Sequence, residues 1–94
     1  MATMFVRHKV SDYDGWKRVY DELASMRKEK GVTGASVHRD GNDPNTIVIT
    51  HRFTDLNAAR AFAGSEDLKS AMMNAGVVGP PEFWFCDDVE QTPY

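Results

Sequence analysis

The sequence predicts an α+β domain in which a sheet carries its helices on one face. Three patterns in the 94 residues indicate this: short β-branched and aromatic segments, amphipathic helical stretches, and turn-forming residues between them. Along the chain the order is strand, helix, strand, strand, helix, strand. This is the ferredoxin-like βαββαβ order, and it predicts a four-stranded antiparallel sheet. No repeat or linker divides residues 1–94, so we expect a single domain.

The first half of the chain predicts a strand followed by a helix. Residues 4–10 are rich in Phe and Val, as strands are. Residues 11–14 supply capping oxygens for a helix over residues 14–30. The helix is expected to end at Gly31, which can adopt the positive φ of a helix stop. A stripe at spacings of three and four residues gives this helix one face that covers a sheet; it consists of Tyr13, Trp16, Tyr20, Leu23 and Arg27.

The second half predicts a hairpin, a helical region and a last strand. Residues 33–39 and 46–53 are strand-like, and the segment between them is a concentrated set of turn formers. Asp55 is expected to begin a helical region that is interrupted near Gly64 and continues as a second short helix. An aromatic run at residues 83–85 predicts the final strand.

Three histidines, His8, His38 and His51, lie on three different predicted strands. Because successive side chains of a strand alternate between faces, we expect all three to point to one face of the sheet. His8 and His51 each continue a row of apolar residues. An imidazole in such a row is either a core residue with a satisfied hydrogen bond or a polar group that lines an apolar pocket. The sequence is compatible with both interpretations.

The ends of the strands predict how close the histidines lie. With the first and third strands as parallel neighbours, about 4.8 Å apart, His8 and His51 are expected to be adjacent because each lies two residues before its strand end. The hairpin is expected to place His38 near Ile47, about 13 Å from His51. A metal centre with three histidine ligands is therefore not expected, since metal–nitrogen bonds are only about 2.1 Å long.

Composition argues against several classes of function. The net charge of −3 opposes nucleic-acid binding, which needs clustered positive charge. No apolar run approaches the ~20 residues of a membrane helix, so no membrane partner is expected. Residues 1–10 do not resemble a signal peptide, and the single cysteine, Cys86, suits a reducing compartment, so we expect a cytoplasmic protein. Asp87 and Asp88 beside Cys86 oppose a reactive thiolate there.

Two segments resemble a known family: VRHKVSDYDGWKRVYDE at residues 6–22 and ITHRFTDLNAARAFAGSEDLKSAM at residues 49–72. The pattern is a strand that ends in Phe53, then a helix that begins with Asp55 and contains paired alanines and Phe62. It is similar to the antibiotic biosynthesis monooxygenase-like domains of the dimeric α/β-barrel superfamily. The resemblance implies a homodimer whose two sheets face each other as a barrel. It also implies a small-molecule cavity between sheet and helices in each subunit.

The sheet face toward the expected partner is predicted to carry four basic residues: Arg7, Lys9, Arg39 and Arg52.

The resemblance implies small-molecule chemistry without a bound cofactor. The superfamily includes cofactor-independent monooxygenases of aromatic polyketides, polyketide cyclases, haem-degrading oxygenases, lactone isomerases and proteins without known activity. Residues 55–76 contain no histidine, which departs from the haem-degrading and plant-type cyclase branches. The function expected is therefore a cofactor-independent monooxygenase or cyclase. The alternative is a noncatalytic ligand-binding or stress-related dimer.

The expected catalytic residues are His51 and His8, because imidazole titrates near neutral pH and can abstract a proton from a phenol or an activated carbon. In a monooxygenase the resulting carbanion reduces oxygen, and in a cyclase an enolate closes a ring. The substrate is expected to be aromatic or polyketide-like. For the apolar members of the predicted substrate-binding set the alternative is simple core packing. The set consists of Trp16, Tyr20, His38, Ile49, Phe62, Met72 and Trp84.

Overall fold

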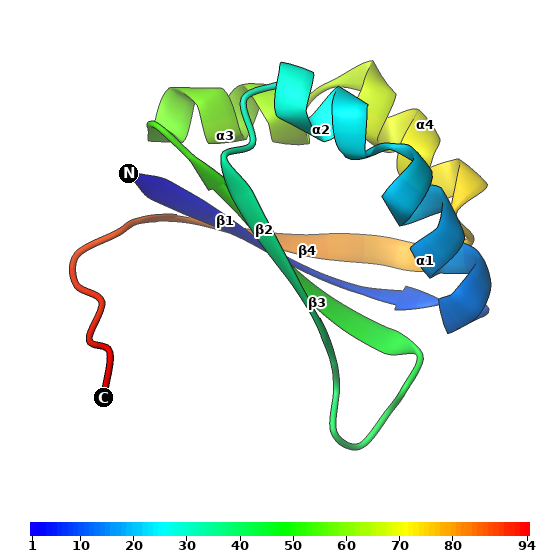
Figure 1. Cartoon of the computed structure of the whole chain (residues 1–94). Coiled ribbons are helices and arrows are strands. Elements are labelled where there is room, and N and C mark those ends of the chain that lie inside the picture. Colours follow the sequence, from blue (N-terminus) through cyan, green and yellow to red (C-terminus); the bar gives the residue numbers. More distant parts are fainter.

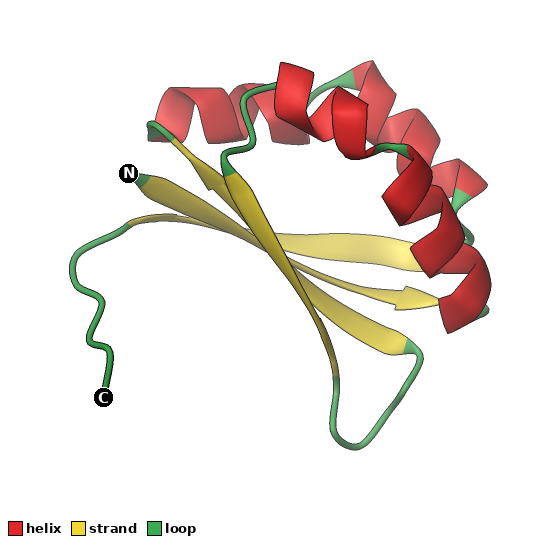
Figure 2. Ribbon diagram, in the orientation of Figure 1, coloured by secondary structure: helices red, strands yellow, loops and turns green.

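In the computed structural model, which describes residues 1–94, four antiparallel strands form one sheet in the order β2-β3-β1-β4. All helices lie on one face of that sheet (Figures 1 and 2). The predicted ferredoxin-like order is confirmed. The elements are β1 (Ala2–Val10), α1 (Tyr13–Glu22), α2 (Ala24–Glu29), β2 (Gly34–Arg39), β3 (Thr46–Phe53), α3 (Leu56–Ala63), α4 (Glu66–Asn74) and β4 (Val77–Asp87).

Strand β1 shows why one sheet face is covered. From Met4 to Val10 its residues alternate between buried and exposed, so every second side chain packs under the helices. Strand β3 contributes a second buried row, and helices α1 and α3 cover both rows. The core consists of Met4, Val6, Val10, Trp16, Ile47, Ile49, Phe53, Ala59 and Phe62.

The expectation that the first and third strands run parallel is wrong. Strand β1 pairs with β3 in antiparallel fashion, with Met4 opposite His51 and His8 opposite Ile47. The reason is topological: the crossover through α1 and α2 returns β2 to the direction of β1, and the hairpin then reverses β3. The two histidine rows therefore run past each other in opposite directions.

The predicted helix over residues 14–30 is two helices, α1 and α2, that meet at Leu23. The Leu23 N–H is shared between the carbonyls of Val19 and Tyr20, at 3.2 and 3.3 Å, and its ψ of 17° bends the chain over the sheet (Figure 1). Gly31 has φ of 99°, as predicted for the stop. No helix has the combination of length and apolar character that crossing a membrane requires.

Side-chain caps begin α3 and α4, and the first of them, at Asp55, is the one that the sequence predicts. The Asp55 carboxylate accepts a hydrogen bond from the Ala58 N–H at 2.8 Å and starts α3. The Ser65 hydroxyl accepts one from the Leu68 N–H at 3.2 Å and starts α4. The predicted interruption near Gly64 is thus a cap-to-cap junction between two short helices.

Strand β4 is longer than the predicted aromatic run. It begins at Val77 and contains a bulge in which Gly79, Pro80 and Pro81 lie opposite the single residue His8 of β1. Proline removes a backbone donor, and a strand at the sheet edge tolerates that loss. The bulge also leaves His8 without a regular neighbour on this side of β1.

The packing predicts a large stability loss for Phe53→Ala. Phe53 is fully buried, and its ring centroid lies 5.6 Å from that of Phe62, so truncation should lower the free energy of unfolding by about 3–5 kcal/mol. Urea denaturation measures the change. Val89→Ala in the exposed tail is the control, with an expected change below about 0.5 kcal/mol. Equal effects of the two substitutions would contradict this core assignment.

Candidate active site between sheet and helices

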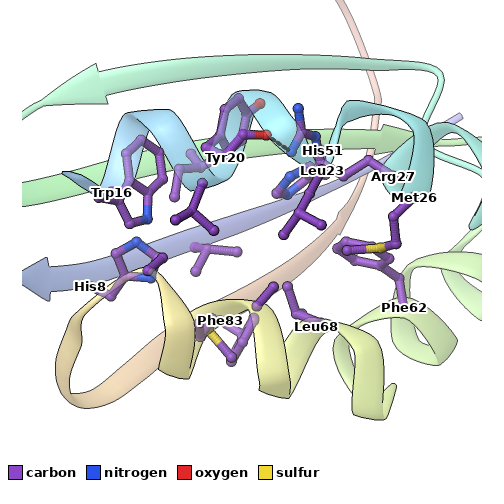
Figure 3. Close-up of a pocket in the computed structure, with 16 residues that line it drawn as sticks. His8, Trp16, Tyr20, Leu23, Met26, Arg27, His51, Phe62, Leu68 and Phe83 are labelled. Carbon is purple, nitrogen blue, oxygen red and sulfur yellow. Dashed lines mark hydrogen bonds between the residues drawn. The ribbon is translucent and has the colours of Figure 1, made fainter. Parts of the chain in front are cut away.

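An apolar pocket lies between the helix-bearing face of the sheet and the helices (Figure 3). Sixteen residues line it and 13 of them are hydrophobic; the other three are His8, Arg27 and His51. The empty space is about 520 Å³ including the mouth, whereas the centre of a water molecule can occupy only about 50 Å³. The pocket is therefore narrow, and a bound molecule would touch its walls closely.

His8 occupies one end of this pocket. Strand β1 holds it on the buried face, where only 6% of its surface is exposed, and its ring meets the Trp16 ring edge to face at a centroid distance of 5.8 Å. Neither ring nitrogen has a hydrogen-bond partner. Burial lowers the pKa of His8 to about 4, because the apolar surroundings disfavour the imidazolium.

His51 lies further along the same pocket, on β3. It is 4% exposed, its ring centroid lies 5.3 Å from that of Phe62, and both of its nitrogens also lack a partner. Burial is the main cause that lowers the pKa of His51 to about 4, and the charges of Arg27 and His8 add to it. At neutral pH both rings are therefore uncharged, and each offers one donor and one acceptor.

The unpartnered nitrogens favour the second of the two sequence interpretations, in which these rings line a pocket. A core histidine needs a satisfied hydrogen bond, and an unsatisfied buried polar group costs about 1–3 kcal/mol. Neither His8 nor His51 has such a bond within the protein. Their position along an apolar cavity instead suits polar groups that a small molecule can reach.

The two rings are not adjacent, contrary to the sequence expectation. His8 lies opposite Ile47 and His51 opposite Met4, so four residue pairs, about 13 Å, separate them along the ladder. This register gives no support to a catalytic imidazole pair or to a metal ion shared between the two. No three side chains of His, Cys, Asp or Glu are arranged to hold a metal ion.

His38 lies outside the pocket, and the expectation that it shares the face of His8 and His51 is wrong. It pairs with Val48, one residue away from the expected neighbour Ile47. The reason is the hairpin register, in which Asp40 rather than Arg39 lies opposite Thr46 and donates its N–H to the Thr46 carbonyl at 2.9 Å. A shift of one residue turns every side chain of a strand to the other face.

The same shift changes the surroundings of two side chains of β2. The exposed His38 ring lies with its Nε2 2.9 Å from the Ser36 hydroxyl on the face without helices. Arg39 moves the opposite way, and its guanidinium lies 4.1 Å from the centre of the Tyr13 ring. The expectation that Arg39 faces the dimer partner is therefore wrong.

Trp84 is the second predicted binding residue that lies elsewhere. It pairs with Phe5 on the open face of the sheet and is 47% exposed, so alternation makes its neighbour Phe83 the pocket residue instead. Sequence reasoning also missed Arg27 as a pocket residue, although the helical stripe that contains Trp16 and Tyr20 already included it. The other predicted binding residues all line the pocket: Trp16, Tyr20, Ile49, Phe62 and Met72.

The fold and the pocket together define a ferredoxin-like domain with an apolar cavity between its sheet and its helices. The chain belongs to the antibiotic biosynthesis monooxygenase family, whose model matches residues 2–73. The resemblance stated from residues 6–22 and 49–72 is thereby confirmed. No curated protein sequence matches the chain.

Solved structures share the fold at low sequence identity. SnoaB, a cofactor-independent oxygenase from Streptomyces nogalater, is 16% identical with a TM-score of 0.77, over 99% of this chain and 97% of that one. A Bordetella bronchiseptica protein named after the same family is 13% identical with a TM-score of 0.79, over 95% and 97%. NE2512 from Nitrosomonas europaea, of unknown function, is 17% identical with a TM-score of 0.74, over 99% and 94%.

The buried imidazoles predict a stability that falls in acid. The unfolded chain binds these protons near the ordinary pKa of 6.5 and the folded chain only near 4, so stabilisation is complete above 6.5 and is lost as pH falls toward 4. Protonation of each histidine should lower the free energy of unfolding by up to ~3 kcal/mol over this pH range. Urea unfolding of the wild type, His8→Leu and His51→Leu at several pH values measures this.

Val89→Ala in the exposed tail is the control for this titration, because it removes no titratable group and should keep the pH dependence of the wild type. His8→Leu and His51→Leu should each flatten the curve between pH 6.5 and 4. An unchanged slope in both would mean that these two rings do not resist protonation in the folded protein.

Proposed function

We propose that the protein is a cofactor-independent small-molecule enzyme of the monooxygenase kind, acting on an aromatic or polyketide-like substrate in the pocket. The observation that carries the proposal is His51: a neutral, buried imidazole with two unpartnered nitrogens inside an apolar cavity. Such a ring can accept a proton from a substrate held against it. Trp16, Tyr20, Ile49, Phe62 and Met72 form the apolar walls in this proposal.

The proposed reaction needs only a base, molecular oxygen and a dry cavity. His51 takes a proton from an activated CH₂ group or phenol, the carbanion passes electrons to O₂, and loss of water leaves a carbonyl. The balance is R₂CH₂ + O₂ → R₂C=O + H₂O. The hydrophobic lining supports this scheme because it limits side reactions of the intermediates with water. SnoaB is described as a cofactor-independent oxygenase, and at 16% identity that likeness concerns the fold alone.

One observation favours a noncatalytic ligand-binding protein as the second candidate. A base works best when its pKa lies near the working pH, and burial lowers the pKa of His51 to about 4. A weakly basic imidazole can hydrogen-bond a ligand without taking a proton from it. The two candidates share the pocket and differ in whether bound ligand is turned over.

Turnover of an aromatic CH₂ compound separates these candidates. With anthrone as the probe and an oxygen electrode as the readout, the wild type should consume oxygen, and His51→Ala should lower the rate by at least ~100-fold because the base is lost. His8→Ala, which removes a hydrogen-bonding group at the other end, should lower it less. His38→Ala is the matched control on the opposite face and should keep the rate of the wild type. Anthrone binding without oxygen uptake would favour the noncatalytic candidate.

We also propose that the chain is a homodimer through the open face of its sheet. This face exposes Phe5, Val78 and Trp84, and Phe5 pairs directly with Trp84. Its basic residues Arg7, Lys9 and Arg52 are each paired with a carboxylate of the same chain, which limits repulsion between copies. A domain of this size gains burial from such an association.

The dimer proposal predicts a solution mass near twice 10.6 kDa by light scattering. Trp84→Glu should yield monomers, because it places a charge in the centre of the proposed apolar interface. Met73→Glu is the control, since this residue is 75% exposed on α4 on the helical side of the molecule. A wild-type mass near 10.6 kDa at micromolar concentration would contradict the dimer.

A further inference from the structure

Arg27 is a cation without a counterion at an apolar pocket. It is half-buried on α2 and lines the cavity, yet no carboxylate lies within 4 Å of its guanidinium. No other charged side chain lines the pocket. The two histidines of the lining are neutral at pH 7. A positive charge in such surroundings favours an anion that can approach it.

The guanidinium of Arg27 is held in a fixed position. Its Nη1 donates to the main-chain carbonyl of Tyr20 at 2.5 Å, and its carbon lies 3.6 Å from the centre of the Tyr20 ring. Figure 3 shows the Arg27 side chain joined to Tyr20 by this hydrogen bond and next to His51. A guanidinium has five N–H donors, so most of them remain free for a ligand.

The two ends of the pocket therefore differ in charge. At one end lie Arg27 and His51, close enough for the arginine charge to act on the imidazole. At the other end His8 lies against the Trp16 ring and opposite the bulge of β4. A ligand with one acidic group has a single favourable orientation in this cavity.

We propose that Arg27 and His51 form a site for an ionised oxygen, and that the pocket takes a planar, weakly acidic phenol or enol with its uncharged end at His8. This inference rests on the proposed use of the pocket as the ligand site. Donors fixed before the ligand arrives stabilise developing negative charge without reorganisation. Arg27 also makes the ligand a stronger acid, which offsets the weak basicity of His51.

The test uses two matched probes: 4-nitrophenol, whose phenolate has its own absorbance band, and 4-nitroanisole, its methyl ether, which cannot ionise. With the full chain at fixed neutral pH, wild-type protein should increase the phenolate fraction of bound 4-nitrophenol. Arg27→Met should weaken phenolate binding at least about tenfold, as expected for a lost charge-assisted hydrogen bond, and leave 4-nitroanisole affinity within about twofold. Unchanged 4-nitroanisole affinity shows that the variant pocket is intact.

Arg18→Met is the control variant, because Arg18 is exposed on α1 and does not line the pocket. It should bind both probes as the wild type does. If Arg27→Met fails to fold, Arg27→Gln tests the same point, since it keeps a hydrogen-bond donor and removes the charge. Equal phenolate binding by the wild type and the Arg27 variant overturns the Arg27 site and leaves the pocket standing. Binding of neither probe by the wild type overturns the ligand pocket itself.

Discussion

The antiparallel pairing of β1 with β3 is the constraint on which the candidate site depends. It brings two buried rows side by side in opposite directions, so that His8 and His51 share one face and yet lie four residue pairs apart. Either ring alone would be one polar defect in the core. Because they are separated, each ring instead lies at a different position along the same pocket. The helices then close over this face, and the bend at Leu23 lets α1 and α2 cover different parts of it.

The helical cover determines the electrostatics of the cavity. Because 13 of its 16 lining residues are hydrophobic, the pocket disfavours charge, and both imidazoles remain neutral with unpartnered nitrogens. The fold bears the cost of these unsatisfied groups, of the order of 1–3 kcal/mol for each. Arg27 adds the one permanent charge at the lining. A narrow apolar cavity that contains a few polar side chains can orient a small molecule more strictly than an entirely apolar cavity can.

Alternation and capping made much of this fold predictable from the sequence. The rows through His8 and His51, the cap at Asp55 and the stop at Gly31 are local patterns, and the structure has each of them. The direction of β3 and the hairpin register were predicted wrongly because both depend on how the chain returns in three dimensions. The hairpin brings Asp40 rather than Arg39 to Thr46, and this shift of one residue puts His38 on the other face.

The composition of the site was harder to predict than the fold. Trp84 and Phe83 are neighbours in an aromatic run, and only the register of β4 against β1 decides which of them faces the helices. Arg27 was visible on the helical stripe, but its lack of a carboxylate partner is a tertiary property. Alternation along a strand therefore predicted which residues line the pocket only where the predicted pairing of the strands was correct.

The chemistry of the pocket depends on His8 and His51 being neutral rings without a partner in the protein. Titration of the imidazole signals by nuclear magnetic resonance tests it most directly, since each histidine can be assigned from the spectra of the His8→Leu and His51→Leu variants. Both pocket rings are expected to titrate near pH 4 in the free protein, because burial lowers the pKa of each. Titration of either ring near its ordinary value of 6.5 would contradict it, because that ring would then be solvated or hydrogen-bonded rather than held in a dry cavity.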